Sequence, residues 1–123
     1  MVIDTSVFIE FLRATDKSKT TLYQIPNDLH IFISSVTLYE LLIGATSEEK
    51  KNDIKTLTED LPILAFNEHV AHKAAEIYHI LKTKNKILEF RDIFIGATSI
   101  VNDLPLKTLN IKHFERIEGI KLG

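Results

Sequence analysis

Hydrophobic residues along the chain form two patterns, short apolar runs and longer amphipathic stretches. The short runs are rich in Ile, Leu, Val and Phe, which favours buried strands. They cover approximately residues 1–4, 29–34, 62–66, 106–109 and 120–122. The longer stretches have apolar residues at helical spacing and predict helices. They cover approximately residues 6–14, 17–25, 35–45, 68–83 and 89–102, and a further helix begins after Ser47.

Strands and helices alternate along the chain, which indicates an α/β fold. Alternation of this kind favours a largely parallel sheet with helices on both faces. We therefore predict a three-layer α/β/α arrangement around a central, mainly parallel sheet of four to five strands. The helix starts are marked by residues that are typical N-caps. These are Ser34 or Ser35, Ser47 and Asn67.

The composition is that of one folded domain covering residues 1–123, of which 45% are hydrophobic. No apolar stretch approaches the ~20 residues that span a bilayer, and the first residues do not resemble a secretory signal, so we expect no membrane association. The chain has no cysteine, which excludes disulfides and cysteine metal sites and fits a cytoplasmic protein. The net charge of −2 gives no overall attraction to nucleic acid.

Three acidic residues lie inside apolar runs. Asp4 closes MVID, Glu40 interrupts VTLYELLIGA, and Asp92 interrupts FRDIFIGA. A carboxylate among apolar residues is costly to bury unless it is paired, neutralised or bound to a metal. Asp4 ends the first predicted strand, and ligands of parallel sheets bind beyond the carboxyl ends of the strands. We therefore hypothesise that the fold gathers the three acids around one cation.

Each acid also has a simpler interpretation. Asp4 can serve as the N-cap of the helix that starts near Ser6. Glu40 can form a structural salt bridge, and Asp92 can form a surface pair with Arg91. The sequence leaves these alternatives open.

Three segments, in their order, resemble the PIN-domain ribonucleases, and most of all the VapC-like toxins of toxin–antitoxin pairs. They are VIDTSVFIEFL, SSVTLYELLIGA and RDIFIGATSIVNDLPLKTLNIKHFERI. The resemblance covers essentially the whole chain. It implies a PIN-like fold and a metal-dependent endoribonuclease that hydrolyses RNA phosphodiester bonds.

The resemblance assigns roles to individual residues. Asp4, Glu40 and Asp92 match the catalytic acids that bind divalent metal. Oxygen ligands without cysteine favour Mg²⁺, for which Mn²⁺ can substitute. The remaining expected site residues are neutral or basic and either bind substrate or support the acids: Thr5, Ser6, Asn110 and Arg91. Of these, Asn110 stands where the family often has a fourth acid, whereas Thr5 and Ser6 can equally serve as capping and turn residues.

The resemblance also implies an RNA substrate, a homodimer, and a cognate antitoxin whose segment lies in an apolar groove. Apolar residues that are either contact surfaces or core are Phe8, Phe11, Leu12, Tyr39 and Ile43. Two sets of basic side chains offer phosphate contacts, although both also suit solvated helix ends. They are Lys82, Lys84 and Lys86, and Lys107, Lys112, His113 and Arg116.

Other functions remain as alternatives. One is a non-catalytic PIN-fold module that binds RNA or protein. Another is phosphotransfer with Asp4 as a covalent nucleophile, although Ser6 stands where a second acid is expected for that chemistry. A helix-borne zinc site is disfavoured, because its candidate ligands lie on the polar face of an amphipathic helix. These ligands are His69, His72, Glu76 and His79.

Overall fold

A central parallel sheet organises the computed structural model, which describes residues 1–123. Its strands are β1 (Val2–Ile3), β2 (Ile33–Ser34), β3 (Ile63–Leu64) and β4 (Leu106–Lys107). β1 pairs with β4 and β2 pairs with β3, all in parallel. Single parallel bridges from Val2 to Phe32 and from Leu106 to Leu122 join these pairs into the order β3-β2-β1-β4 with Leu122 at the edge. The expected parallel sheet is confirmed, but its strands are shorter than predicted because helices begin directly after β1 and β2.

The helices are α1 (Thr5–Arg13), a 3-10 turn (Lys17–Lys19), α2 (Thr21–Gln24), α3 (Ser35–Gly44), α4 (Glu48–Thr58), α5 (Glu68–Thr83), α6 (Phe90–Val101) and α7 (Ile111–Phe114). Every predicted helix is present, although the stretch expected at 17–25 is split into two short segments. α7 was not predicted, because four residues are too few to show helical periodicity. No helix is both long and apolar enough to cross a bilayer.

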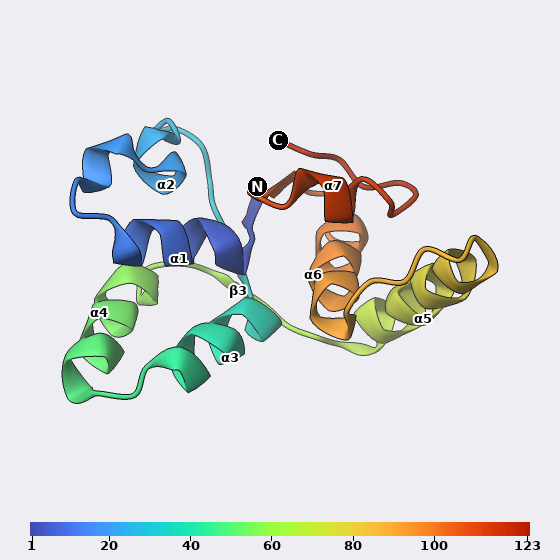
Figure 1. The fold of residues 1–123 in the computed structure, drawn as a ribbon, viewed down its shortest axis with the longest axis horizontal. Coiled ribbons are helices and arrows are strands. Elements are labelled where there is room, and N and C mark those ends of the chain that lie inside the picture. Colours follow the sequence, from blue (N-terminus) through green and yellow to red (C-terminus); the bar gives the residue numbers. More distant parts are fainter.

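The sheet separates two groups of helices, with α1–α4 on one side and α5–α7 on the other (Figure 1). Successive residues of a strand point to opposite faces. Accordingly, Val2 packs in the cluster that contains Ile77 of α5, Ile93 of α6 and Phe114 of α7. Its neighbour Ile3 packs in the other cluster, with residues of α1, α3 and α4. The predicted three-layer arrangement is therefore confirmed, with a core on each face of β1.

The predicted N-caps begin three of the helices. Ser34 Oγ accepts a hydrogen bond from Thr37 N at 3.1 Å, and Ser47 Oγ accepts one from Lys50 N at 3.2 Å. Asn67 Oδ1 accepts one from Val70 N at 3.0 Å. These bonds satisfy backbone donors that the first helical turn leaves without partners. Local capping chemistry therefore sets where α3, α4 and α5 begin.

The burial of α3 decides an alternative that the sequence left open. Tyr39 and Ile43 were expected to be either contact surface or core, and in the structure each is 62% exposed. α3 packs through one face only, on which Thr37 and Leu41 are buried. An all-apolar helix has no polar face to turn outward, so part of its apolar surface remains on the outside.

Gly96 of α6 tests how tightly α6 packs against the C-terminal segment. A Cβ at this position would lie 2.6 Å from Ile117 Cδ1, and Ile117 is itself buried. We predict that Gly96→Ala lowers the free energy of unfolding by about 1–3 kcal/mol through overpacking. Gly44→Ala is the matched control, because a Cβ at Gly44 meets nothing within 4 Å. Urea unfolding of both variants measures the difference, and equal midpoints would contradict the prediction.

Candidate active site

Asp4 lies at the carboxyl end of β1 and is 3% exposed. It occupies the N-cap position of α1 but makes no side-chain capping bond. Its Oδ2 instead accepts hydrogen bonds from Ser6 Oγ at 2.7 Å and from Thr108 Oγ1 at 2.8 Å. Its Oδ1 accepts none. The capping interpretation therefore describes the position of Asp4 but not the contacts of its side chain.

The two hydroxyls that hold Asp4 are themselves held by the chain after β4. Leu109 N donates to Ser6 Oγ at 3.1 Å, and Asn110 N donates to Thr108 Oγ1 at 3.0 Å. The contact of Thr108 with Asp4 was not predicted from the sequence. The position of Thr108 at the end of a predicted strand could have indicated it, since parallel strands end at the same edge of a sheet.

Glu40 reaches the same region from α3, and its side chain is 15% exposed. Its Oε1 accepts a hydrogen bond from Thr5 Oγ1 at 2.8 Å, and its Oε2 lies 3.2 Å from Arg91 Nη1. Arg91 also pairs with Glu89 at 2.8 Å and is 58% exposed. Glu40 therefore forms the salt bridge that the sequence left as an alternative. Its partner Arg91 lies largely in solvent, where ion pairs add little stability.

Thr5 connects Glu40 to a further buried hydroxyl. Thr5 Oγ1 lies 2.9 Å from Thr37 Oγ1, which has no other hydrogen-bond partner. A hydroxyl has one proton and a carboxylate only accepts. Thr5 Oγ1 therefore shares its proton between Glu40 and Thr37, and the bond to the carboxylate is the stronger of the two. Thr5 thus links the buried Thr37 hydroxyl to Glu40.

Asp92 lies in the first turn of α6, with its side chain 14% exposed. Burial and the nearby charge of Asp4 raise the pKa of Asp92, against the opposing effects of Arg91 and His113. His113 Nδ1 lies 3.7 Å from Asp92 Oδ2. The expected surface pair of Arg91 with Asp92 is replaced by the contact of Arg91 with Glu40.

The acids thus come from the start of α1, the middle of α3 and the start of α6. Asp4 and Asp92 lie close enough to repel each other, whereas Glu40 is held by Thr5 and Arg91. In these side-chain positions no three acidic or histidine residues form a metal-binding group. The shared cation site consequently stays a prediction.

The other candidate residues are placed as follows. Asn110 is exposed at the N-cap position of α7, and its side chain makes no capping bond. The histidines of α5 are exposed, as expected for a solvated face, and form no metal-binding group with Glu76. Glu10 of α1 is partly buried, and its Oε1 accepts a hydrogen bond from Thr21 N at 2.6 Å. Glu10 therefore ties α2 to α1.

Known proteins resemble the chain over nearly its whole length. A family model described as PIN domain matches residues 1–120. The chain belongs to the PIN-domain family.

Among its PIN-domain relatives, Ribonuclease VapC1 of Rickettsia felis is 30% identical, and the match covers 99% of this chain and 93% of the relative. A crystal structure of DNA-bound VapBC from Salmonella typhimurium is similar at 25% identity and a TM-score of 0.89, over 99% of this chain and 95% of that chain. A toxin–antitoxin complex from Klebsiella pneumoniae shares the fold at 24% identity and a TM-score of 0.77, over 97% and 93% of the two chains.

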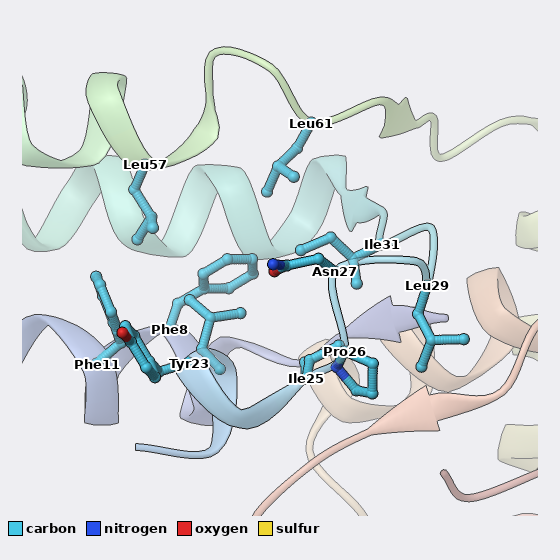
Figure 2. Close-up of a pocket in the computed structure, with 11 residues that line it drawn as sticks. Phe8, Phe11, Tyr23, Ile25, Pro26, Asn27, Leu29, Ile31, Leu57 and Leu61 are labelled. Carbon is cyan, nitrogen blue, oxygen red and sulfur yellow. The ribbon is translucent and has the colours of Figure 1, made fainter. Parts of the chain in front are cut away.

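This PIN domain has an apolar groove of about 660 Å³ between α1, α2 and α4. Figure 2 shows the side chains that line it, among them Phe8, Phe11 and Tyr23. Leu29 and Tyr23 lie on its rim and are largely exposed. None of the three acids lines this groove. It is therefore a separate surface from the candidate active site.

A second apolar surface contains a row of aromatic rings on α5, α6 and the segment before α5. Phe66 and Phe94 meet edge to face with centroids 4.8 Å apart, and Phe90 lies 6.2 Å from both Phe94 and Tyr78. The row continues toward Tyr39 of α3 through a groove that Phe94 and Tyr39 share. We call these five residues the aromatic face.

The raised pKa of Asp92 predicts a dependence of stability on pH. The folded protein holds a proton on Asp92 to a higher pH than the unfolded chain does, so ionised Asp92 destabilises the fold at neutral pH. Asp92→Asn removes this penalty. We expect the metal-free variant to melt above the wild type at pH 7, and the gap to close as the pH falls through the raised pKa of Asp92.

Asp103→Asn is the control for this measurement. Lys121 lowers the pKa of the exposed Asp103 through a hydrogen bond and its charge, so this variant should gain no stability at pH 7. Thermal melts in EDTA between pH 4 and pH 8 provide the comparison. A lower melting temperature for Asp92→Asn at pH 7 would show that the ionised carboxylate does not destabilise the fold.

Proposed function

We propose that this protein is a metal-dependent endoribonuclease that hydrolyses RNA phosphodiester bonds and acts as the toxin of a toxin–antitoxin pair. The observation that carries this proposal is the electrostatic interaction of Asp4 with Asp92, together with the contacts of Glu40 with Thr5 and Arg91, the chain neighbours of the two aspartates. Ribonuclease activity is supported by the relationship to Ribonuclease VapC1 of Rickettsia felis, which extends over nearly the whole of both chains.

The donor set fits a hard divalent cation. Asp4 is nearly buried, yet its Oδ1 accepts no hydrogen bond, and neither carboxylate oxygen of Asp92 accepts one. These oxygens are the ligand type that Mg²⁺ and Mn²⁺ prefer. Two ionised carboxylates that repel each other are stabilised by a shared cation. We therefore propose Asp4, Asp92 and Glu40 as its ligands.

The reaction that we propose is hydrolysis of a phosphodiester bond by water. A bound Mg²⁺ supplies positive charge that polarises the scissile phosphate and lowers the pKa of a nearby water. Ser6 and Thr108 orient Asp4, while Thr5 orients Glu40. Arg91 is exposed and can transfer from Glu40 to a substrate phosphate. Asn110 adds a neutral oxygen at the same edge, so the three carboxylates provide the negative charge of the site.

The apolar groove between α1, α2 and α4 is the surface that we propose for a segment of the antitoxin. It contains the predicted contact residues Phe8 and Phe11. We propose that the aromatic face joins two copies in a homodimer, because large exposed apolar patches mark protein interfaces. Tyr39 and Phe90 are 62% and 65% exposed there. An antitoxin as partner is supported by the similar structure from Klebsiella pneumoniae, which is a toxin–antitoxin complex.

One observation favours the alternative of a non-catalytic PIN-fold module that binds RNA or protein. The pairing of Glu40 with Arg91 engages one of the three acids and neutralises part of the site. Such a module would bind RNA without cleaving it.

Cleavage of an end-labelled RNA separates the two functions. We expect cleavage by the wild type with Mg²⁺ or Mn²⁺ and none in EDTA. Loss of a side chain that only supports a metal ligand typically lowers activity about 10–100-fold. We expect the cleavage rate of Asp4→Asn and of Asp92→Asn to fall by more than this, because each substitution removes the charge of a proposed metal ligand. Asp103 is an exposed acid that contacts Lys121 and none of the three site acids, so Asp103→Asn should cleave RNA like the wild type. Binding without cleavage by the wild type would instead support the module.

We expect Thr37 to influence the affinity for the metal, because it contacts Thr5, which in turn holds Glu40. Thr37→Val keeps the shape of the buried side chain but removes the hydroxyl that holds Thr5 in place. We predict about tenfold weaker Mn²⁺ binding, as for other outer-shell partners, whereas Thr37→Ser keeps the hydroxyl and should bind Mn²⁺ like the wild type. Calorimetric titration with Mn²⁺ measures both. Equal Mn²⁺ affinities of the two variants would refute this positioning role.

A further inference from the structure

Two grooves extend from Glu40 in different directions. One lies between α3 and α6 and belongs to the aromatic face, with Tyr39, Ile43 and Phe94 in its lining. The other lies between α1, α3 and α4 and has a volume of about 290 Å³. We call this second space the α1–α3–α4 groove. Since Glu40 lines both, each offers a path for a substrate held at the acids.

The α1–α3–α4 groove combines an apolar floor with a basic rim. The floor is formed by Ile9, Leu12 and Leu41, and the rim carries Arg13 and Lys50. Neither cation forms an ion pair, and neither side chain donates a hydrogen bond within the protein. Asp53 is the only acid of the lining besides Glu40. Two unpaired cations over apolar side chains match a nucleotide, which has a phosphate and a flat base.

We propose that the α1–α3–α4 groove binds a nucleotide of single-stranded RNA that flanks the scissile phosphate. Arg13 and Lys50 contact its phosphates, and its base packs on Ile9, Leu12 and Leu41. This inference rests on the proposed ribonuclease function and adds the path of the substrate. The base must be unpaired to enter, which is typical of protein contacts to the bases of RNA loops and ends.

The other groove is less suited to RNA. Its one cation is Arg91, which already contacts Glu40 and Glu89. Its lining continues into the exposed rings of the aromatic face, which suit a protein surface. The volume of the α1–α3–α4 groove lies near the lower end of the range for small-molecule pockets. That size is enough for a single base.

A charge variant tests the basic rim. We compare Arg13→Gln/Lys50→Gln with Lys19→Gln/Lys55→Gln, which removes the same two charges from exposed positions outside the groove. The probe is a fluorescein-labelled, unstructured RNA of mixed sequence, cleaved with Mn²⁺ at several KCl concentrations. For the rim variant we expect KM to rise about tenfold. The slope of log KM against log[KCl] should fall by about 1.4, because each lost contact to a single-strand phosphate lowers it by about 0.7. The control variant should change neither.

A steric variant tests the floor without changing charge. Gly44 lines the groove, and a Cβ built there meets nothing within 4 Å. Gly44→Met should therefore fold normally, with an unchanged melting temperature, and place its side chain where the base would lie. We expect a higher KM for the labelled RNA with Gly44→Met and a smaller change with Gly44→Ala. Neither variant should alter the affinity for Mn²⁺.

The outcomes separate this inference from the ribonuclease proposal. If the wild type cleaves the RNA but the rim variant matches its control, or Gly44→Met matches the wild type, the groove does not bind substrate and the ribonuclease proposal stands. If the variants weaken binding of an inhibitory protein and leave KM unchanged, the groove takes a protein segment and the inference fails. If the wild type cleaves no RNA with either metal, both proposals fail.

Discussion

Repulsion between two nearly buried carboxylates is the constraint on which the candidate site depends. Asp4 and Asp92 come from distant parts of the chain, and the pKa of Asp92 is raised by its burial and by the nearby charge of Asp4. The protein compensates with neutral hydroxyls on one side, from Ser6 and Thr108, and with His113 on the other. None of these partners cancels the charge of both acids. A protein that retains such a pair with only the exposed Arg91 and His113 as nearby basic side chains is suited to hold a cation from solution.

Glu40 is held differently from the two aspartates. One of its oxygens accepts from a chain of buried hydroxyls, and the other faces an arginine on the surface. The first contact is rigid because Thr5 and Thr37 are buried, whereas the second can exchange with water or substrate. Glu40 therefore has a fixed orientation and a replaceable partner. It also lies at the junction of two grooves, so the same residue connects the acids with both adjoining surfaces.

Much of the fold was predictable because its signals are local. Apolar runs marked the strands, and Ser34, Ser47 and Asn67 marked the helix starts. The acids were recognisable because charge inside an apolar run is unusual. Contacts between distant segments were not predictable, and so the role of Thr108 and the pairing of Arg91 with Glu40 were missed. Whether the apolar side chains of α3 are core or surface could not be decided from the sequence, since hydrophobicity alone does not tell a core surface from one that faces outward.

The sheet pairing has a consequence for how the protein is assembled. β1 and β4 are neighbours in the sheet although they stand near opposite ends of the sequence, and the bond from Thr108 to Asp4 spans 104 residues. Pairings of such long range form late in folding, after most of the backbone is available. During translation, a nascent chain that has not yet exposed β4 cannot complete the surroundings of Asp4. The ribosome that makes this protein therefore carries a chain with an incomplete candidate site for most of the elongation period.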